Sequence, residues 1–237
     1  MAGAWFLALC LASVTTVGCG LVDLESFNGF TFNLPEKTYN IDTEDSRWDS
    51  PPANAFPNVS CGVGGVLGDC CTAPVGSPFT VDCKKYPLAC EASSCTYKLT
   101  YEVGSVVDLK KEVAQLNSTT SASLKKITLK NIKLTLTNNL NMAMPPVDVF
   151  VAPMDATTAA DPRARKLATL PGHEAGYNGS ETVPVDAAGQ AAFSMFAQNY
   201  NVPFKILARA VITLKGGQPA PTGKAIARIG GQAEAEL

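Results

Sequence analysis

Apolar and polar residues alternate in several segments of the second half of the chain, which is the pattern of β-strands buried on one face. Clean alternation predicts strands at residues 97–103, 147–151, 166–170 and 202–215. Gly216-Gly217 then marks a turn, and residues 223–229 are predicted to return as the antiparallel partner of the preceding strand. From Gly230 onward we expect a frayed tail.

One further predicted strand, residues 123–138, carries a break in its period. The apolar residues up to Leu129 share one parity, whereas those from Ile132 onward share the other. Because side chains alternate with a period of two, this slip predicts a β-bulge near Asn131. The pair Asn138-Asn139 is predicted to end the strand in a turn or loop.

Two short helices are expected beside these strands. Asp108 can cap residues 109–116 and Asp186 can cap residues 187–199, because an aspartate side chain accepts hydrogen bonds from the first backbone amides of a helix. Residues 29–34 could add a strand to the same sheets. Alternating strands joined by turns predict a mainly β chain: an antiparallel β-sandwich with one or two short helices and a disulfide-rich N-terminal segment.

The order of elements from Ser123 onward, strand–strand–strand–helix–strand–strand, resembles the LEA-2 (water-stress) β-sandwich family. The matching features are residues 132–139 (Ile-Lys-Leu-Thr-Leu-Thr-Asn-Asn), the Pro-Val-Asp-Val strand at 146–149, and the helix before two terminal strands. The resemblance is one of pattern and covers roughly the last half of the chain. It implies a non-enzymatic protein with no shared catalytic residues.

The N-terminal residues 1–22 carry no charged side chain, and residues 4–12 form an apolar run typical of a signal peptide. The following Thr16-Val17-Gly18-Cys19 resembles the lipobox of bacterial lipoproteins. That resemblance implies cleavage before Cys19 and attachment of lipid to its thiol and new amine. Two alternatives remain open: ordinary cleavage near Gly18 or Gly20 would give a secreted protein, and an uncleaved N-terminus could anchor the chain in a membrane.

Six further cysteines crowd into one short stretch: Cys61, Cys70, Cys71, Cys83, Cys90 and Cys95. Their spacing contains no paired C-x2-C motifs, so the pattern does not indicate a zinc or iron–sulfur site. In an exported chain, six clustered cysteines predict three disulfides, although the sequence does not fix which residues pair. The bridges would order residues 42–96, which hold too few apolar positions to order themselves.

Composition and candidate chemistry exclude several classes of function. A net charge of −2, with no basic stripe, gives no case for nucleic-acid binding. The single histidine, His173, lies in a predicted loop and is interpreted as exposed, and no Gly-x-Ser-x-Gly motif accompanies it. The acidic residues Asp42, Glu44, Asp45 and Asp49 are interpreted as a solvated loop rather than a calcium site. We therefore expect no enzyme, cofactor or metal.

The predicted organisation is a signal peptide (1–18), a tether (19–26), an N-terminal strand plus disulfide-rich segment (27–104) and a β-sandwich domain (105–237). The leading hypothesis is a non-enzymatic lipoprotein of the bacterial envelope, anchored through Cys19. In enteric bacterial lipoproteins an Asp after the lipid-bearing cysteine signals retention in the inner membrane, and Gly20 stands at that position here, so the resemblance implies the outer membrane. The partner would be an envelope protein or a small apolar ligand. The alternatives are a secreted ligand or lipid carrier, which needs a cavity on the order of several hundred Å³, and an exported hydrolase built on His173 or the acidic loop.

Overall fold

The computed structural model describes residues 29–45, 88–91, 94–117, 124–216, 218 and 221–236. Within these residues the strands are β1 (Phe30–Asp42), β2 (Leu88–Glu91), β3 (Ser94–Val107), β4 (Lys126–Leu140), β5 (Val147–Ala152), β6 (Arg165–Leu170), β7 (Asn178–Pro184), β8 (Phe204–Lys215) and β9 (Gly223–Glu236). The helices are α2 (Leu109–Glu112), α3 (Ala114–Asn117) and α4 (Ala187–Ala197). None of these helices is long and apolar enough to cross a membrane.

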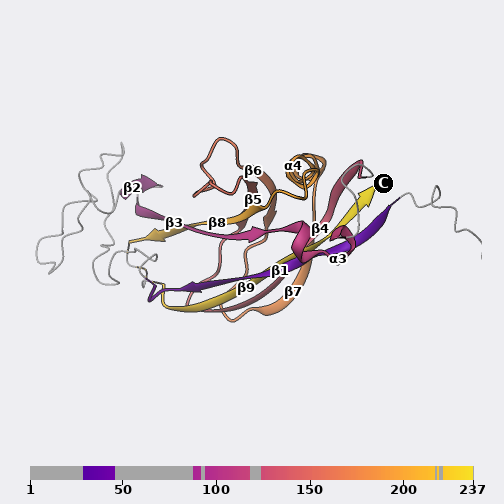
Figure 1. The fold of residues 1–237 in the computed structure, drawn as a ribbon. Helices are drawn as coiled ribbons and strands as arrows, with labels where there is room; N and C mark the ends of the chain where they lie inside the picture. The colour runs from indigo at the N-terminus through magenta and orange to yellow at the C-terminus, as the bar shows by residue number, and fades with distance from the viewer. Residues whose placement is uncertain are drawn as a thin grey trace, which may run out of the picture.

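The strands form two antiparallel sheets that lie one above the other (Figure 1). The four-stranded sheet has the order β1-β9-β4-β7, and the five-stranded sheet has the order β2-β3-β8-β5-β6. Apart from the short β2, successive strands cross from one sheet to the other except at the β5–β6 connection. This is the jelly-roll arrangement, in which two Greek keys wrap into a double sheet. The predictions of a mainly β chain and of antiparallel sheets are confirmed.

One apolar core fills the space between the sheets, and the period of two explains how each strand reaches it. In β4, for example, Ile132, Leu134 and Leu136 are buried while Lys133 between them is exposed. The register of β4 against β9 shifts between Leu129 and the residue two positions later, which confirms the bulge predicted there. The bulge lets the apolar residues on both sides of it face the same core.

The helices begin at the predicted caps. Asp108 accepts a hydrogen bond from the Lys111 amide at 3.2 Å, and Asp186 accepts one from the Gly189 amide at 2.7 Å. The predicted helix at residues 109–116 is interrupted at Val113, which is extended, so that two short helices form in its place. The longer α4 closes one end of the core, where the ring of Phe193 meets that of a β8 phenylalanine edge-on.

The strand β7 was not predicted, and three further features of the strands in the C-terminal half differ from the predictions. The strand β9 pairs with β1 and β4, not with the preceding β8, so the last two strands lie in different sheets. It also continues to Glu236 instead of fraying, because Ala233 and Ala235 are fully buried. Finally, Asn138 belongs to β4 and not to a turn: it is buried, and its amide donates to the carbonyl of Met142 at 3.2 Å.

The predicted domain boundary at residues 104 and 105 does not follow the sheets. It falls inside β3, and β3 pairs along its length with β8. The strand β1, predicted to belong with the disulfide-rich segment, pairs with β9 along the edge of the four-stranded sheet. Both strands therefore complete the same double sheet as the C-terminal half.

Candidate functional site

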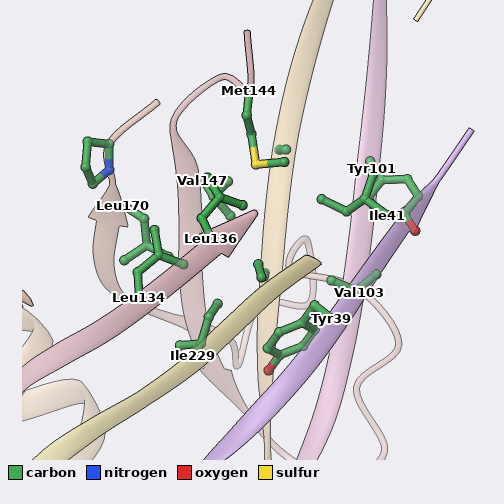
Figure 2. Close-up of a pocket in the computed structure, with 14 residues that line it drawn as sticks. Tyr39, Ile41, Tyr101, Val103, Leu134, Leu136, Met144, Val147, Leu170 and Ile229 are labelled. Carbon is green, nitrogen blue, oxygen red and sulfur yellow. The ribbon is translucent and has the colours of Figure 1, made fainter. Parts of the chain in front are cut away.

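The space between the sheets is the first candidate site, since a carrier would hold its ligand there. Figure 2 shows side chains of both sheets turned toward one another around a void of about 30 Å³. Its walls are apolar and include Leu136 and Met144. Burial raises the pKa of Tyr39, so the one hydroxyl nearby on β1 stays neutral.

A second void of about 30 Å³ lies beside Phe193, farther along the core. Each void is about the size of one water molecule. The cavity that the carrier hypothesis requires is therefore not present between the described parts of the two sheets.

His173 is the second candidate, and the prediction that it is exposed is wrong. Its side chain is 12% exposed, stacks on Tyr177 with ring centroids 3.9 Å apart, and shares a 2.8 Å hydrogen bond between Nε2 and Oε1 of Glu181. Two backbone hydrogen bonds with Met144 hold the same residue in place. Within the described residues, no serine, threonine or cysteine side chain hydrogen-bonds to the imidazole. These contacts hold the loop around His173 in place.

The acidic segment after β1 is the third candidate. Asp42 forms an ion pair with Lys224 at 2.9 Å and accepts a hydrogen bond from the Glu44 amide at 3.0 Å. The hydrogen bond from Lys224 is the main reason that the pKa of Asp42 lies below its usual range, and the bond from the Glu44 amide lowers it further. Asp49 lies outside the described residues. Among the residues that are described, no three His, Cys, Asp or Glu side chains gather as metal ligands would.

Of the predicted lipid-anchor and disulfide residues, only Cys90 and Cys95 fall within the described residues; the predicted lipid anchor and the other four cluster cysteines lie outside them. Cys90 and Cys95 lie opposite each other in the β2–β3 pair, and both are disulfide-bonded. The formation of three disulfides by the six clustered residues stays a prediction.

The outer face of the four-stranded sheet holds a shallow groove of about 370 Å³. We call it the outer groove. Strand register builds it in two rows. One row aligns Asn33 of β1, Gln232 of β9 and Asn131 of β4 as direct neighbours. The next row places Lys133 of β4 between Gly230 of β9 and Thr182 of β7.

Irregular backbone surrounds the outer groove on two strands. The register of β1 against β9 shifts between Leu34 and Lys37, and the β4 bulge lies on the other side of β9. Glu36, within the β1 irregularity, adds a carboxylate to the rim. Bulges bend a strand and redirect its side chains, so the two together open the face at this level.

Side chains in the outer groove differ from their neighbours on the same face in their hydrogen bonding. Toward the N-terminal end of β7, Thr135 forms a 2.8 Å hydrogen bond with Ser180, and Thr137 donates one to Asn178 at 3.1 Å. In the part of the chain that the structure describes, no such bond or ion pair occupies the polar side chains of the outer groove, which are Asn33, Glu36, Asn131, Lys133, Thr182 and Gln232. Their donors and acceptors are available to a ligand.

The sequence held two signals for this site. The period slip at Asn131 located one bulge, and Gly230-Gly231 interrupts a strand at the matching level. Glycine within a strand often marks a bulge or a close approach. The amide row itself could not be found this way, because it joins three segments that meet only through long-range register.

Comparisons with known proteins give no family. No protein-family model matches the chain, and no curated protein does. Among solved structures, the decameric BFDV capsid protein is similar over 88% of this chain and 99% of that chain, with 8% identity and a TM-score of 0.33. Desmodium yellow mottle tymovirus (70% and 91% covered, 13% identity, TM-score 0.23) and turnip yellow mosaic virus (78% and 92%, 10%, 0.25) are also similar. TM-scores this low carry no argument about this chain.

Proposed function

We propose that the chain is a non-enzymatic lipoprotein of a bacterial envelope, in which Cys19 carries lipid and the double sheet, a β-sandwich, acts as a binding or scaffolding module. In this proposal the six clustered cysteines, of which Cys90 lies in β2 and Cys95 in β3, pair as disulfides. The observation that carries the binding role is the contrast between a filled interior and an outer groove whose polar side chains are unpaired within the described residues.

The position of the sheets supports the anchored arrangement. β1 begins at Phe30, 11 positions after the proposed lipid-bearing cysteine. An extended chain reaches at most about 3.3–3.6 Å per residue, so the start of β1 would stay within roughly 40 Å of the membrane surface. A module held at that distance would act on envelope components.

The carrier and hydrolase alternatives receive less support. A carrier that binds between the sheets would need to open a core whose voids are about 30 Å³ each. A hydrolase built on His173 would need a nucleophile next to an imidazole that is already engaged by Glu181 and Tyr177.

Mass spectrometry of the membrane-extracted full chain tests the anchor. We expect a mature N-terminus at Cys19 that carries fatty acyl groups, and partition of the protein into the detergent phase. The variant Cys19→Ser should remain unacylated, whereas Cys10→Ser, inside the segment removed, should be processed like the parent. An unmodified thiol at residue 19, or intact residues 1–18, would contradict the proposal.

A further inference from the structure

We infer that the outer groove binds a glycan chain of N-acetylated sugars, specifically the glycan strands of the cell wall. This inference deepens the proposed function and rests on it for the location of the ligand. The chemistry of the groove itself is independent of the anchor.

The amide row supplies the first reason. Asn33, Gln232 and Asn131 come from three adjacent strands and are paired directly in register. Each side-chain amide offers one carbonyl acceptor and an NH₂ donor. An acetamido group offers a carbonyl acceptor and one N–H donor, and the side-chain amides of the row can donate to the first and accept from the second. Sugar hydroxyls can use the remaining donors and acceptors.

The charge of the groove supplies the second reason. Its two ionisable groups, Glu36 and Lys133, have opposite sign, so that the groove has no net charge. The carboxylate of Glu36 would repel an anionic polymer, and the ammonium of Lys133 would repel a cationic one. A neutral, polyhydroxylated chain can donate to the first group and accept from the second, and charge-assisted hydrogen bonds of this kind are strong.

The glycines in the middle of the groove supply the third reason. A Cβ at Gly231 would lie 2.6 Å from the carbonyl oxygen of Asn131, so packing within the sheet requires glycine there. A Cβ at Gly230 would lie no closer than 3.6 Å to any heavy atom, so packing does not require glycine at that position. What glycine provides at 230 is room above the backbone, where a ligand can approach closely.

The size of the groove fits a short stretch of such a chain. Its volume of about 370 Å³ falls at the lower end of the range of about 300–1,000 Å³ for small-molecule sites. It extends across all four strands, with lining residues from β1, β9, β4 and β7.

The experiment uses the full chain in detergent and fluorescently labelled tetra-N-acetylchitotetraose, followed by fluorescence anisotropy. We expect saturable binding, and weaker binding of cellotetraose, which has the same sugar backbone without acetamido groups. Sedimentation with purified peptidoglycan should carry the protein down, and free tetra-N-acetylchitotetraose should release it. No binding at millimolar tetra-N-acetylchitotetraose, or equal binding of cellotetraose, would overturn the inference.

Matched variants separate the groove from the rest of the face. Asn33→Ala with Gln232→Ala removes two unpaired amides and should raise the dissociation constant about tenfold, as expected for two lost hydrogen bonds. Gly230→Val should also weaken binding by filling the groove. Thr137→Ala with Asn178→Ala removes a hydroxyl and an amide already bonded to each other outside the groove, and should leave binding unchanged. Equal losses in both double variants would overturn the inference.

Failure of the anchor and failure of the glycan site give different results. The variant Cys19→Ser should lose acylation but bind tetra-N-acetylchitotetraose with the affinity of the parent. If residue 19 proves unmodified while the glycan still binds, only the proposed anchoring is wrong. If the chain is acylated but no glycan binds, only the inference about the groove is wrong.

Discussion

The loop between β5 and β6, residues 153–164, lies over the outer face of the five-stranded sheet, whereas the outer groove of the four-stranded sheet is open. Under the loop, Leu207 packs with Ala152 and Ala156 in a small apolar cluster. Lys205 donates to the carbonyl of Ala156 at 2.8 Å, and Glu102 accepts from the Ala159 amide at 3.3 Å. Polar side chains on the outer face of the five-stranded sheet therefore hydrogen-bond to the backbone of the loop and keep it against the sheet.

Charged residues on the covered face also pair with one another across strands. Glu102 of β3 lies 3.5 Å from Arg209 of β8, which is aligned with Asp148 of β5. Asp148 in turn accepts hydrogen bonds from Lys166 at 2.6 Å and Thr169 at 2.7 Å. The comparison teaches that the same alternation of side chains can serve internal stability on one sheet and leave a surface for binding on the other.

The largest expected effect comes from the apolar residues that point outward from each sheet. Leu207→Ala should destabilise the protein by about 2–4 kcal/mol, because Leu207 is only 4% exposed beneath the loop. Ile226→Ala, on the open face and 41% exposed, should cost less than about 1 kcal/mol. Urea unfolding of both variants measures the difference. Equal losses would mean that the loop does not cover its sheet in solution.

Glycine substitutions should give the next largest contrast, this time within the outer groove. Gly231→Ala should cost about 1–3 kcal/mol, because the added Cβ meets the Asn131 carbonyl. Gly230→Ala should change stability by no more than about 0.5 kcal/mol. Thermal unfolding of the two variants tests this, and a large loss at Gly230 would show that packing needs that glycine after all.

A smaller effect is expected from the charged residues. Glu102→Gln should cost about 1 kcal/mol, because it weakens the bonds to the loop amide and to Arg209. Glu234→Gln is the control on the open face, where Glu234 forms an ion pair with the half-exposed Lys130; its cost should stay below about 0.5 kcal/mol. Denaturant midpoints measured at low ionic strength test this. A larger loss of stability in Glu234→Gln than in Glu102→Gln would contradict the comparison.

The smallest effect is a dependence on pH that Asp148 should produce. Burial opposes ionisation of this carboxyl, but the hydrogen bonds from Lys166 and Thr169 outweigh it and hold the pKa below its usual range. A lowered folded-state pKa contributes stability above the unfolded value of about 3.9, and that contribution is lost as pH falls through the folded value. Asp148→Asn should therefore show a smaller fall in melting temperature between neutral pH and pH 3 than the parent. An unchanged fall would contradict the role of these bonds.

Local patterns in the sequence were sufficient for most strands but not for their partners. The alternation in β8 and the period slip at Asn131 were both visible, because each depends on neighbouring residues. The assignment of β9 to the sheet of β1 was not, since it depends on pairing across nearly the whole chain. Small inward residues such as Ala233 made the last part of β9 resemble a tail.

The strand β7 was missed for a related reason. Its inward positions include Gly179 and Glu181, so the apolar alternation that marks other strands is weak. Glu181 points inward at the sheet edge because it bonds to His173, and that bond joins two segments eight residues apart through a turn. The pairing of β7 with β4 joins segments far apart in the sequence. So does the pairing of β9 with β1 and β4 that assembles the outer groove, which is why sequence patterns alone did not reveal the candidate site.

Nuclear magnetic resonance of the side-chain amide groups tests the central claim most directly. On titration of the full chain with tetra-N-acetylchitotetraose, the NH₂ signals of Asn33, Asn131 and Gln232 should shift together and saturate. Those of the buried Asn138 and the already bonded Asn178 should stay in place. Shifts confined to residues between the sheets, or no shifts among the three groove amides, would contradict the account of a filled interior and an open binding face.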